Sequence, residues 1–244
     1  MSGERALQAL ADAVGDSRPR RPEDIEDADV PVAATVVLLR DTSAGPEVLL
    51  IERPDRGSFA GAWVFPGGKV DPEDAGDTEP ERARAAGVRE TREETGLHLD
   101  AADLQVLSQW DPPPGLPLRI RTWFFLARDP GGELALAADE AVASAWRGPA
   151  DVLAAHGRGE IVLYPPTWVT LHDLSAQADV DDLLAVVRLG GLRRFETVAR
   201  RGSRGPMLLW RGDAEYEGDA GGEAPATRHR LDVSELPWVY TRSD

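Results

Sequence analysis

The apolar and polar positions along the chain predict strands mixed with helices. Residues 31–41 and 47–53 are β-branched and apolar on both faces, as expected for two adjacent strands buried on both sides. The pattern continues downstream with strand-like runs, at 104–110, 118–128 and 141–146, and then with helix-like runs, at 151–156, 168–176 and 179–189. This mixture favours an α/β sandwich over a helical bundle.

The alanine-rich segment 79–95 predicts the most clearly delimited helix. Thr78 is followed three residues later by Glu81, which is the spacing of a capping box. Pro80 is tolerated in the first turn, where backbone amides have no intrahelical partner. Gly96 suits the left-handed position after the last turn. Local signals therefore predict both ends of this helix.

Three parts of the chain are expected to differ in role. Residues 1–29 begin with a short helical pattern and continue as a charged, proline-containing run, so we interpret them as an arm and linker. Residues 30–190 carry the mixed pattern of one elaborated domain. Residues 191–244 add strand-like runs at 207–210 and 229–233, and we expect them to pack on the same domain as a hairpin or sheet edge.

The composition narrows the classes of function. The 244 residues include 43 acidic and 27 basic side chains, for a formal charge of −16, which argues against a nucleic-acid partner. The absence of cysteine excludes disulfides and thiolate chemistry. No segment has the apolar core of a signal peptide or the roughly 20 apolar residues of a membrane span. We therefore expect a cytoplasmic protein with no membrane association.

Three glutamates in the second half of the predicted helix are the leading candidates for chemistry. Glu90, Glu93 and Glu94 are spaced i, i+3 and i+4, so their carboxylates share one helix face. Alone, such a triplet is most simply a solvated acidic face. It is preceded, however, by FPGGKVD (65–71), whose glycines let the backbone approach a ligand. Glycines and clustered carboxylates together indicate a site for a hard cation such as Mg²⁺, which also binds substrate phosphates.

The segment RETREETGL (89–97) resembles the signature of the Nudix hydrolase family. Seven residues separate Glu81 from Arg89, as in that signature, and the register is kept through Leu97. Two positions depart from it: Thr91 stands where the family has an apolar residue, and twelve residues rather than five separate Gly68 from Glu81. The longer spacing is a polar, turn-forming insertion that should extend a surface loop.

The resemblance implies a Nudix fold, an α/β/α sandwich around a mixed β-sheet, and a role for each signature residue. Glu90, Glu93 and Glu94 would bind Mg²⁺ or Mn²⁺, and Glu90 is also a candidate base for the attacking water. Arg89 would orient the carboxylates through Glu81. The resemblance also implies a backbone carbonyl ligand and a distal acidic ligand, for which the candidates are Gly68 and Glu140. Glu140 is equally well explained as an ordinary solvated loop residue.

Residues 49–74 are similar to the corresponding segment of coenzyme A and acyl-CoA diphosphatases, and later stretches resemble the acyl-CoA-cleaving branch called Nudix-motif 19. The implied reaction is hydrolysis of the diphosphate in a nucleoside-diphosphate-linked small molecule, most simply CoA, acyl-CoA or another ADP-linked metabolite. Guanidinium groups pair bidentately with phosphate oxygens, which gives four candidates for substrate binding. These are Arg53, Arg56, Arg119 and Arg121.

Two alternatives to this function remain at the level of sequence. An ADP-ribose or NADH diphosphatase would carry the same metal-binding glutamates. A nucleotide-sensing module would keep the fold without catalysis, although its glutamates would then be expected to degenerate. A homodimer is possible through an edge strand of the C-terminal extension.

Overall fold

The fold is seen in a computed structural model, which describes residues 12, 18–24, 27, 29–56, 59–116, 119–218 and 227–243. None of the helices in these ranges is long and apolar enough to cross a membrane.

The main sheet has eight strands and is mixed. Its hydrogen-bonded order is β3-β2-β1-β6-β5-β8, with β4 pairing with β1 and β7 with β2. The β1–β6 and β5–β8 pairs are parallel and the others are antiparallel. The strands are β1 (Val32–Thr42), β2 (Gly45–Glu52), β3 (Trp63–Val64), β4 (Gly67–Lys69), β5 (Gln105–Asp111), β6 (Arg121–Arg128), β7 (Ala143–Arg147) and β8 (Arg193–Glu196).

Helices cover both faces of the main sheet. Side chains alternate between the faces of a strand, and β1 follows this rule. Val36 and Leu38 pack in one apolar cluster with α2, and Val37 and Leu39 pack in another with α3, α4 and α5. The helices are α2 (Glu79–Thr95), α3 (Pro149–Gly157), α4 (Pro165–Leu174) and α5 (Val180–Gly190), and short 3₁₀ turns lie at Pro22–Asp24 and Ala101–Asp103. The predicted α/β/α sandwich around a mixed sheet is therefore confirmed.

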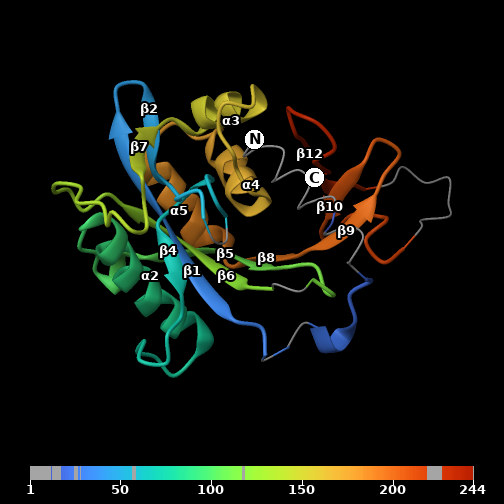
Figure 1. Cartoon of the computed structure of the whole chain (residues 1–244), viewed down its shortest axis with the longest axis horizontal. Coiled ribbons are helices and arrows are strands. Elements are labelled where there is room, and N and C mark those ends of the chain that lie inside the picture. The colour runs from blue at the N-terminus through green and yellow to red at the C-terminus, as the bar shows by residue number, and fades with distance from the viewer. Residues whose placement is uncertain are drawn as a thin grey trace.

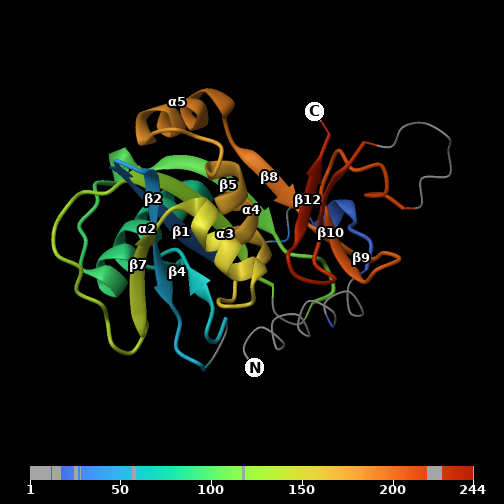
Figure 2. The same cartoon turned by 90° about the horizontal axis from the view of Figure 1, so that it is seen from above.

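A second sheet of four antiparallel strands, here called the C-terminal sheet, lies beside the sandwich at the end where β8 leaves it (Figures 1 and 2). Its strands are β9 (Val198–Arg201), β10 (Pro206–Leu209), β11 (His229–Asp232) and β12 (Val239–Arg242). Trp210 and Leu231 are buried in the same apolar cluster as α4 and α5. Residues 191–244 thus supply both an edge strand of the main sheet and a sheet of their own; the division at residue 190 stays a prediction.

The described part of the N-terminal segment is held against the body of the protein. Arg20 Nη2 donates to the carbonyl oxygens of Pro112, at 2.6 Å, and Thr197, at 3.0 Å. Asp24 is buried and accepts from Arg18. Residues 18–24 are therefore anchored, whereas residues 1–11, 13–17, 25, 26 and 28 of the predicted arm lie outside the described residues.

Candidate active site

Helix α2 positions most of the site and begins and ends where its sequence predicts. Glu81 Oε2 accepts from the backbone amide of Thr78 at 2.9 Å, which completes the capping box. Gly96 adopts the left-handed conformation, with φ at 75°, and its amide bonds to the carbonyl of Arg92. The helix packs closely on β1 because Gly87 has no side chain to hold it away from Val36. Its C-terminal half is thereby held beside β4.

Gly67 and Gly68 let β4 lie close to β1 on one side and to α2 on the other. At Gly67, φ is 153°, and a Cβ would overlap the backbone of Ala34 in β1. At Gly68, a Cβ would overlap the carboxylate of Glu90. The FPGG turn therefore brings backbone groups directly against α2 at the level of its glutamates, and it places Gly68 beside a predicted metal ligand.

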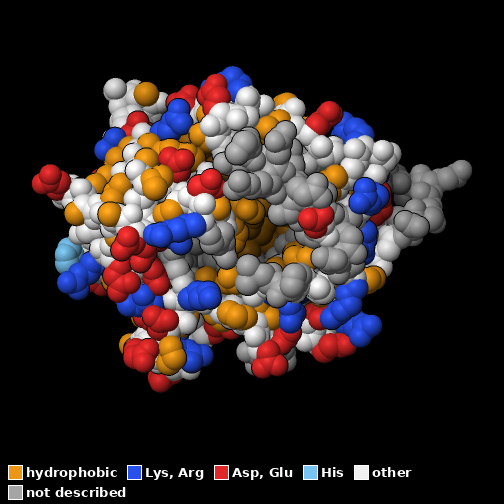
Figure 3. All heavy atoms as spheres, in the orientation of Figure 1, with side chains coloured by type: hydrophobic (Ala, Val, Ile, Leu, Met, Phe, Trp, Pro, Cys, Tyr) orange, Lys and Arg blue, Asp and Glu red, His pale blue; other side chains and the backbone are white. Residues whose placement is uncertain are grey.

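Three glutamates form what we call the carboxylate cluster. One carboxylate oxygen from each of Glu90, Glu94 and Glu140 lies within 4.8 Å of the other two. Glu140 comes from the turn before β7. The preceding loop is tied to the end of α2, since the amides of Ala135 and Ala137 donate to the carbonyls of Thr95 and Glu94. Acidic side chains gather over α2 on the face drawn in Figure 3.

Glu94 is the most deeply placed member of the carboxylate cluster. Its side chain is 0% exposed, Oε1 accepts from Arg53 Nη1 at 2.7 Å, and Oε2 accepts from the amide of Gly67 at 2.8 Å. Burial raises the pKa of Glu94 to about 8, and burial also raises the pKa of Glu90. A carboxylate in such a place needs positive charge nearby to stay ionised.

Arg89 orients Glu90, but its acidic anchor is Asp74 rather than Glu81. Nε and Nη2 of Arg89 donate to the two oxygens of Asp74, each at 3.0 Å, and Nη1 donates to Glu90 Oε1 at 2.8 Å. The expectation that Arg89 acts through Glu81 is therefore wrong. Glu81 is occupied with the amides of Asp77 and Thr78 at the start of the helix, two turns before Arg89.

Glu93 stands apart from the carboxylate cluster. Its side chain is 52% exposed, and Oε2 accepts from Arg89 Nη1 at 3.2 Å. In the described part of the chain, the set of acidic residues close enough to share an ion includes Glu90, Glu94 and Glu140 but not Glu93. The structure thus groups two of the three helix glutamates with the distal candidate, while the roles of all of them stay predictions.

The four arginines predicted to bind substrate lie in two places. Arg53 and Arg56 lie near the carboxylate cluster: Arg53 pairs with Glu94, and Arg56 donates to the carbonyl of Asp139 at 3.1 Å. The other two are engaged elsewhere. Arg119 Nη2 donates to Asp27 at 2.8 Å. Arg121 is buried and pairs with Asp111 and with Glu79, which lies at the opposite end of α2 from Glu94.

Sequence reasoning missed the roles of Gly67 and Asp74. Gly67 lies in the FPGG turn, so its closeness to α2 was implied, but its hydrogen bond to Glu94 was not. Asp74 lies in the insertion after β4 and is buried, with an oxygen that also accepts from the amide of Asp71 at 2.8 Å. No local spacing distinguishes Asp74 from the other acidic residues of that insertion.

The residues of the carboxylate cluster fit a hard divalent cation. Mg²⁺ and Mn²⁺ prefer oxygen ligands, and three carboxylates from two elements converge here. Like charges this close repel, and among the described residues the cations paired with them are Arg53 and Arg89. A divalent cation would offset the remaining repulsion.

The carboxylate cluster lies in the part of the chain that is similar to known proteins. The NUDIX domain model matches residues 29–165. The CTP pyrophosphohydrolase of Escherichia coli (strain K12) is 33% identical over 107 residues, which are 44% of this chain and 70% of that protein. A NUDIX hydrolase structure from Alicyclobacillus acidocaldarius has a TM-score of 0.58 at 26% identity and covers 64% of this chain and 96% of its own. All three glutamates of the carboxylate cluster lie within the range matched by the model.

Proposed function

Because the chain belongs to the NUDIX family and is a diphosphohydrolase acting on nucleoside diphosphate derivatives, we propose that its carboxylate cluster binds Mg²⁺ or Mn²⁺ and that its substrate is CoA or acyl-CoA. The observation that carries the first part is the convergence of Glu90, Glu94 and Glu140 within 4.8 Å, with Glu94 wholly buried.

The division of labour among these residues follows from their surroundings. Glu94 is fixed by Arg53 and Gly67 and serves as a rigid ligand. Glu90 is the candidate proton acceptor for the attacking water, because Arg89 holds Oε1 and the second carboxylate oxygen keeps lone pairs for a proton. Gly68 leaves the space that the Glu90 carboxylate occupies. A bound divalent cation would lower the pKa of a water and neutralise charge on the phosphates.

The choice of CoA or acyl-CoA rests on the resemblance of residues 49–74 to the diphosphatases that cleave these substrates. Arg56 supports it from the structure: its side chain is 71% exposed and lies beside the turn that carries Glu140. A guanidinium at that position is available to a phosphate outside the carboxylate cluster. Arg53 donates to Glu94 through Nη1, and its other N–H groups are left to contact a phosphate.

The test is a hydrolysis panel of CoA, acyl-CoA, ADP-ribose, NADH and CTP with Mg²⁺ or Mn²⁺, run on the wild type, Glu94→Gln and Glu93→Gln. We expect CoA or acyl-CoA to be hydrolysed fastest and Glu94→Gln to lose roughly 100-fold or more in kcat. Glu93→Gln removes the same charge one residue away and should lose much less. Mn²⁺ binding followed by electron paramagnetic resonance should weaken in the same order.

Each other result has a distinct meaning. Faster hydrolysis of ADP-ribose or NADH would keep the reaction and replace the proposed substrate. Equal losses in the two variants would place Glu93 among the ligands, as the sequence predicted. Binding of nucleotides without hydrolysis of any would overturn the catalytic proposal in favour of a sensing module.

A further inference from the structure

A second concave site lies where the main sheet meets the C-terminal sheet. It is a pocket of about 340 Å³, formed by β8, the turn after β10, β11 and the end of β12. Its lining includes Phe195, Gly212, His229, Ser243 and five arginines, which are Arg193, Arg194, Arg211, Arg228 and Arg242. We call it the arginine pocket. Pockets of this size hold small ligands.

The charge of the arginine pocket is opposite to that of the chain. The protein carries a formal charge of −16, yet no carboxylate is among the described residues that line this pocket. Three of its arginines pair with carboxylates of residues outside the lining set, namely Asp173, Glu196 and Glu215. Arg194 bonds instead to the neutral amide of Gln109. Even after these pairs are counted, the lining carries more positive than negative charge.

The paired arginines are held in place by ion pairs and by aromatic rings. Arg193 lies over the ring of Phe195, at 5.6 Å, and donates to Asp173 at 2.6 Å. Arg211 lies over the ring of Tyr216, at 5.7 Å, and donates to Glu196. A guanidinium has five N–H donors, so one ion pair leaves others for a ligand. Side chains that are already fixed lose less entropy when a ligand binds.

His229 completes the wall as a neutral group. Its Nδ1 lies 2.8 Å from the carbonyl oxygen of Arg211, so Nδ1 carries the proton, and Nε2 accepts from the hydroxyl of Tyr240 at 3.0 Å. Burial lowers the pKa of His229, which keeps the ring uncharged at neutral pH. Both ring nitrogens are thus occupied, so a ligand would meet the arginines and the hydroxyl of Ser243 as side-chain donors.

The arginine pocket is separate from the carboxylate cluster. Arg53 follows β2, whereas the pocket lies at β8, four strands away in the main sheet. Adjacent strands are about 4.8 Å apart, which separates the two sites by roughly 19 Å across the sheet. The pocket also borders the apolar cluster of α3, α4 and α5, through Phe195, rather than that of α2.

We propose that the arginine pocket binds a phosphoryl group, either as an inorganic phosphate ion or as part of a small phosphorylated metabolite. Phosphate oxygens match the planar fork of a guanidinium, and several arginines around one hollow can contact one phosphoryl group from different sides. The concave shape favours a small anion over an extended acidic peptide, which would need a longer surface. This proposal is independent of the reaction at the carboxylate cluster.

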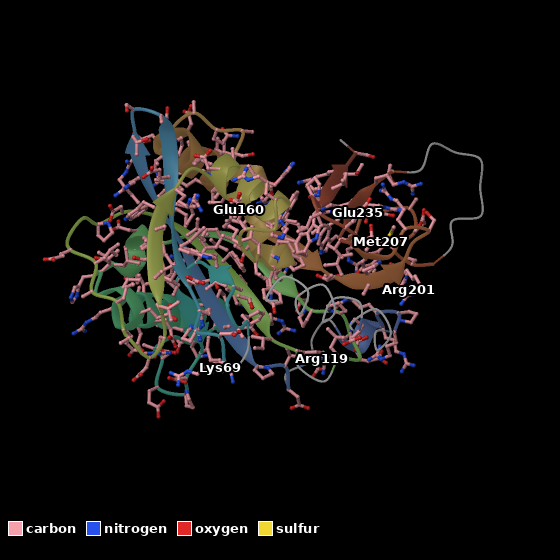
Figure 4. The ribbon with its side chains drawn as sticks, turned by 45° about the horizontal axis from the view of Figure 1, so that its top comes forward. Lys69, Arg119, Glu160, Arg201, Met207 and Glu235 are labelled. Atoms are coloured by element: carbon pink, nitrogen blue, oxygen red, sulfur yellow. The ribbon has the colours of Figure 1, made fainter. Side chains whose placement is uncertain are left out.

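The test is titration calorimetry on the full chain in EDTA with phosphate, pyrophosphate, ADP and a poly-glutamate peptide. EDTA removes the cations through which phosphates would bind at the carboxylate cluster, and the pocket variants show whether the remaining binding is at the arginine pocket. We expect one phosphoryl ligand per chain and at least a tenfold weaker Kd in Arg194→Gln/Arg242→Gln. The matched control is Arg201→Gln/Arg204→Gln, which removes the same charge from β9 and the turn after it, outside the pocket; Figure 4 labels Arg201. The control should bind as the wild type does.

The outcomes separate the sources of the ligand. Tighter binding of ADP than of phosphate and pyrophosphate assigns the pocket to an organic phosphate, and tighter binding of either inorganic ion assigns it to that ion. No binding of any phosphoryl compound, equal weakening in both double variants, or tighter binding of poly-glutamate would overturn the proposal. If the pocket double variant fails to fold, the single Arg242→Gln variant, at the exposed end of β12, serves in its place.

Discussion

Arg53 and Glu94 form an ion pair between Nη1 and Oε1 at 2.7 Å, although they are 41 positions apart in the chain. The pair joins the residue that follows β2 to the last turn of α2. Its two members differ in environment, since the side chain of Glu94 is 0% exposed and that of Arg53 is 31% exposed. Arg53 therefore supplies positive charge to a carboxylate that water does not reach.

The difference in burial predicts that loss of Arg53 destabilises the fold, because it leaves the buried Glu94 carboxylate without its positive partner. Arg53→Gln should cost about 2 kcal/mol in the free energy of unfolding, since a buried carboxylate loses its partner. Adding Glu94→Gln should restore most of that loss, because the neutral amide needs no counter-charge. Urea unfolding in EDTA at pH 9, where Glu94 is ionised because its pKa is raised to about 8, measures both, with Glu94→Gln alone as the remaining corner of the cycle. A double variant no more stable than Arg53→Gln would contradict this account.

Gly68→Ala should impair catalysis without unfolding the protein. The added Cβ would overlap the Glu90 carboxylate, and φ at Gly68 is not positive, so the backbone itself accepts alanine. We expect kcat to fall roughly 100-fold, since small displacements of catalytic groups have effects of this size. Gly190→Ala is the matched control, because a Cβ there meets no atom within 4 Å. Equal activity of the two variants would show that Glu90 moves aside without consequence.

Asp74 and Glu81 are expected to separate into a positioning residue and a structural one. Asp74→Asn weakens the hold on Arg89, and through it the position of Glu90, so kcat should fall about tenfold with little change in KM. Glu81→Gln loses the charged half of the capping box, so the thermal midpoint should fall while kcat stays within about twofold. Steady-state kinetics and thermal unfolding of both variants distinguish the roles. A large loss of kcat in folded Glu81→Gln would restore its predicted catalytic role.

The contrast between these residues shows which parts of the site could be predicted from sequence. The bounds of α2 depend on Thr78, Glu81 and Gly96, which act within one turn of the helix end, so local spacing was sufficient. The spacing of the helix glutamates was equally local. It could not show which of the helix glutamates meet Glu140, because Glu140 comes from the distant turn before β7.

Contacts between distant segments were the least predictable. Asp74 reaches Arg89 because the insertion after β4 folds back on α2, and nothing in its polar, turn-forming sequence specifies which acid is buried. Arg121 was predicted to bind substrate from its charge alone, but its neighbours Asp111 and Glu79 come from other elements. Of the strands in residues 191–244, only β10 and β11 were visible as apolar runs; β8, β9 and β12 were not predicted, and the assembly of a separate sheet depends on long-range pairing.

His156 predicts how the stability of the fold depends on pH. The residue is 3% exposed, its ring meets that of Trp238 edge to face at 4.5 Å, and Nδ1 has no hydrogen-bond partner among the described residues. Burial lowers the pKa of His156 from 6.5 to about 4. In the unfolded chain His156 is therefore protonated below about pH 6.5, whereas in the folded protein it is protonated only below about pH 4. The free energy of unfolding falls as the pH drops from the first value to the second. The loss should approach about 3 kcal/mol.

Urea unfolding at pH 7 and pH 4 should show this loss as an advantage in stability gained by His156→Leu over the wild type, because leucine cannot titrate. Parallel losses in the two proteins would mean that His156 is protonated in the folded state well above pH 4.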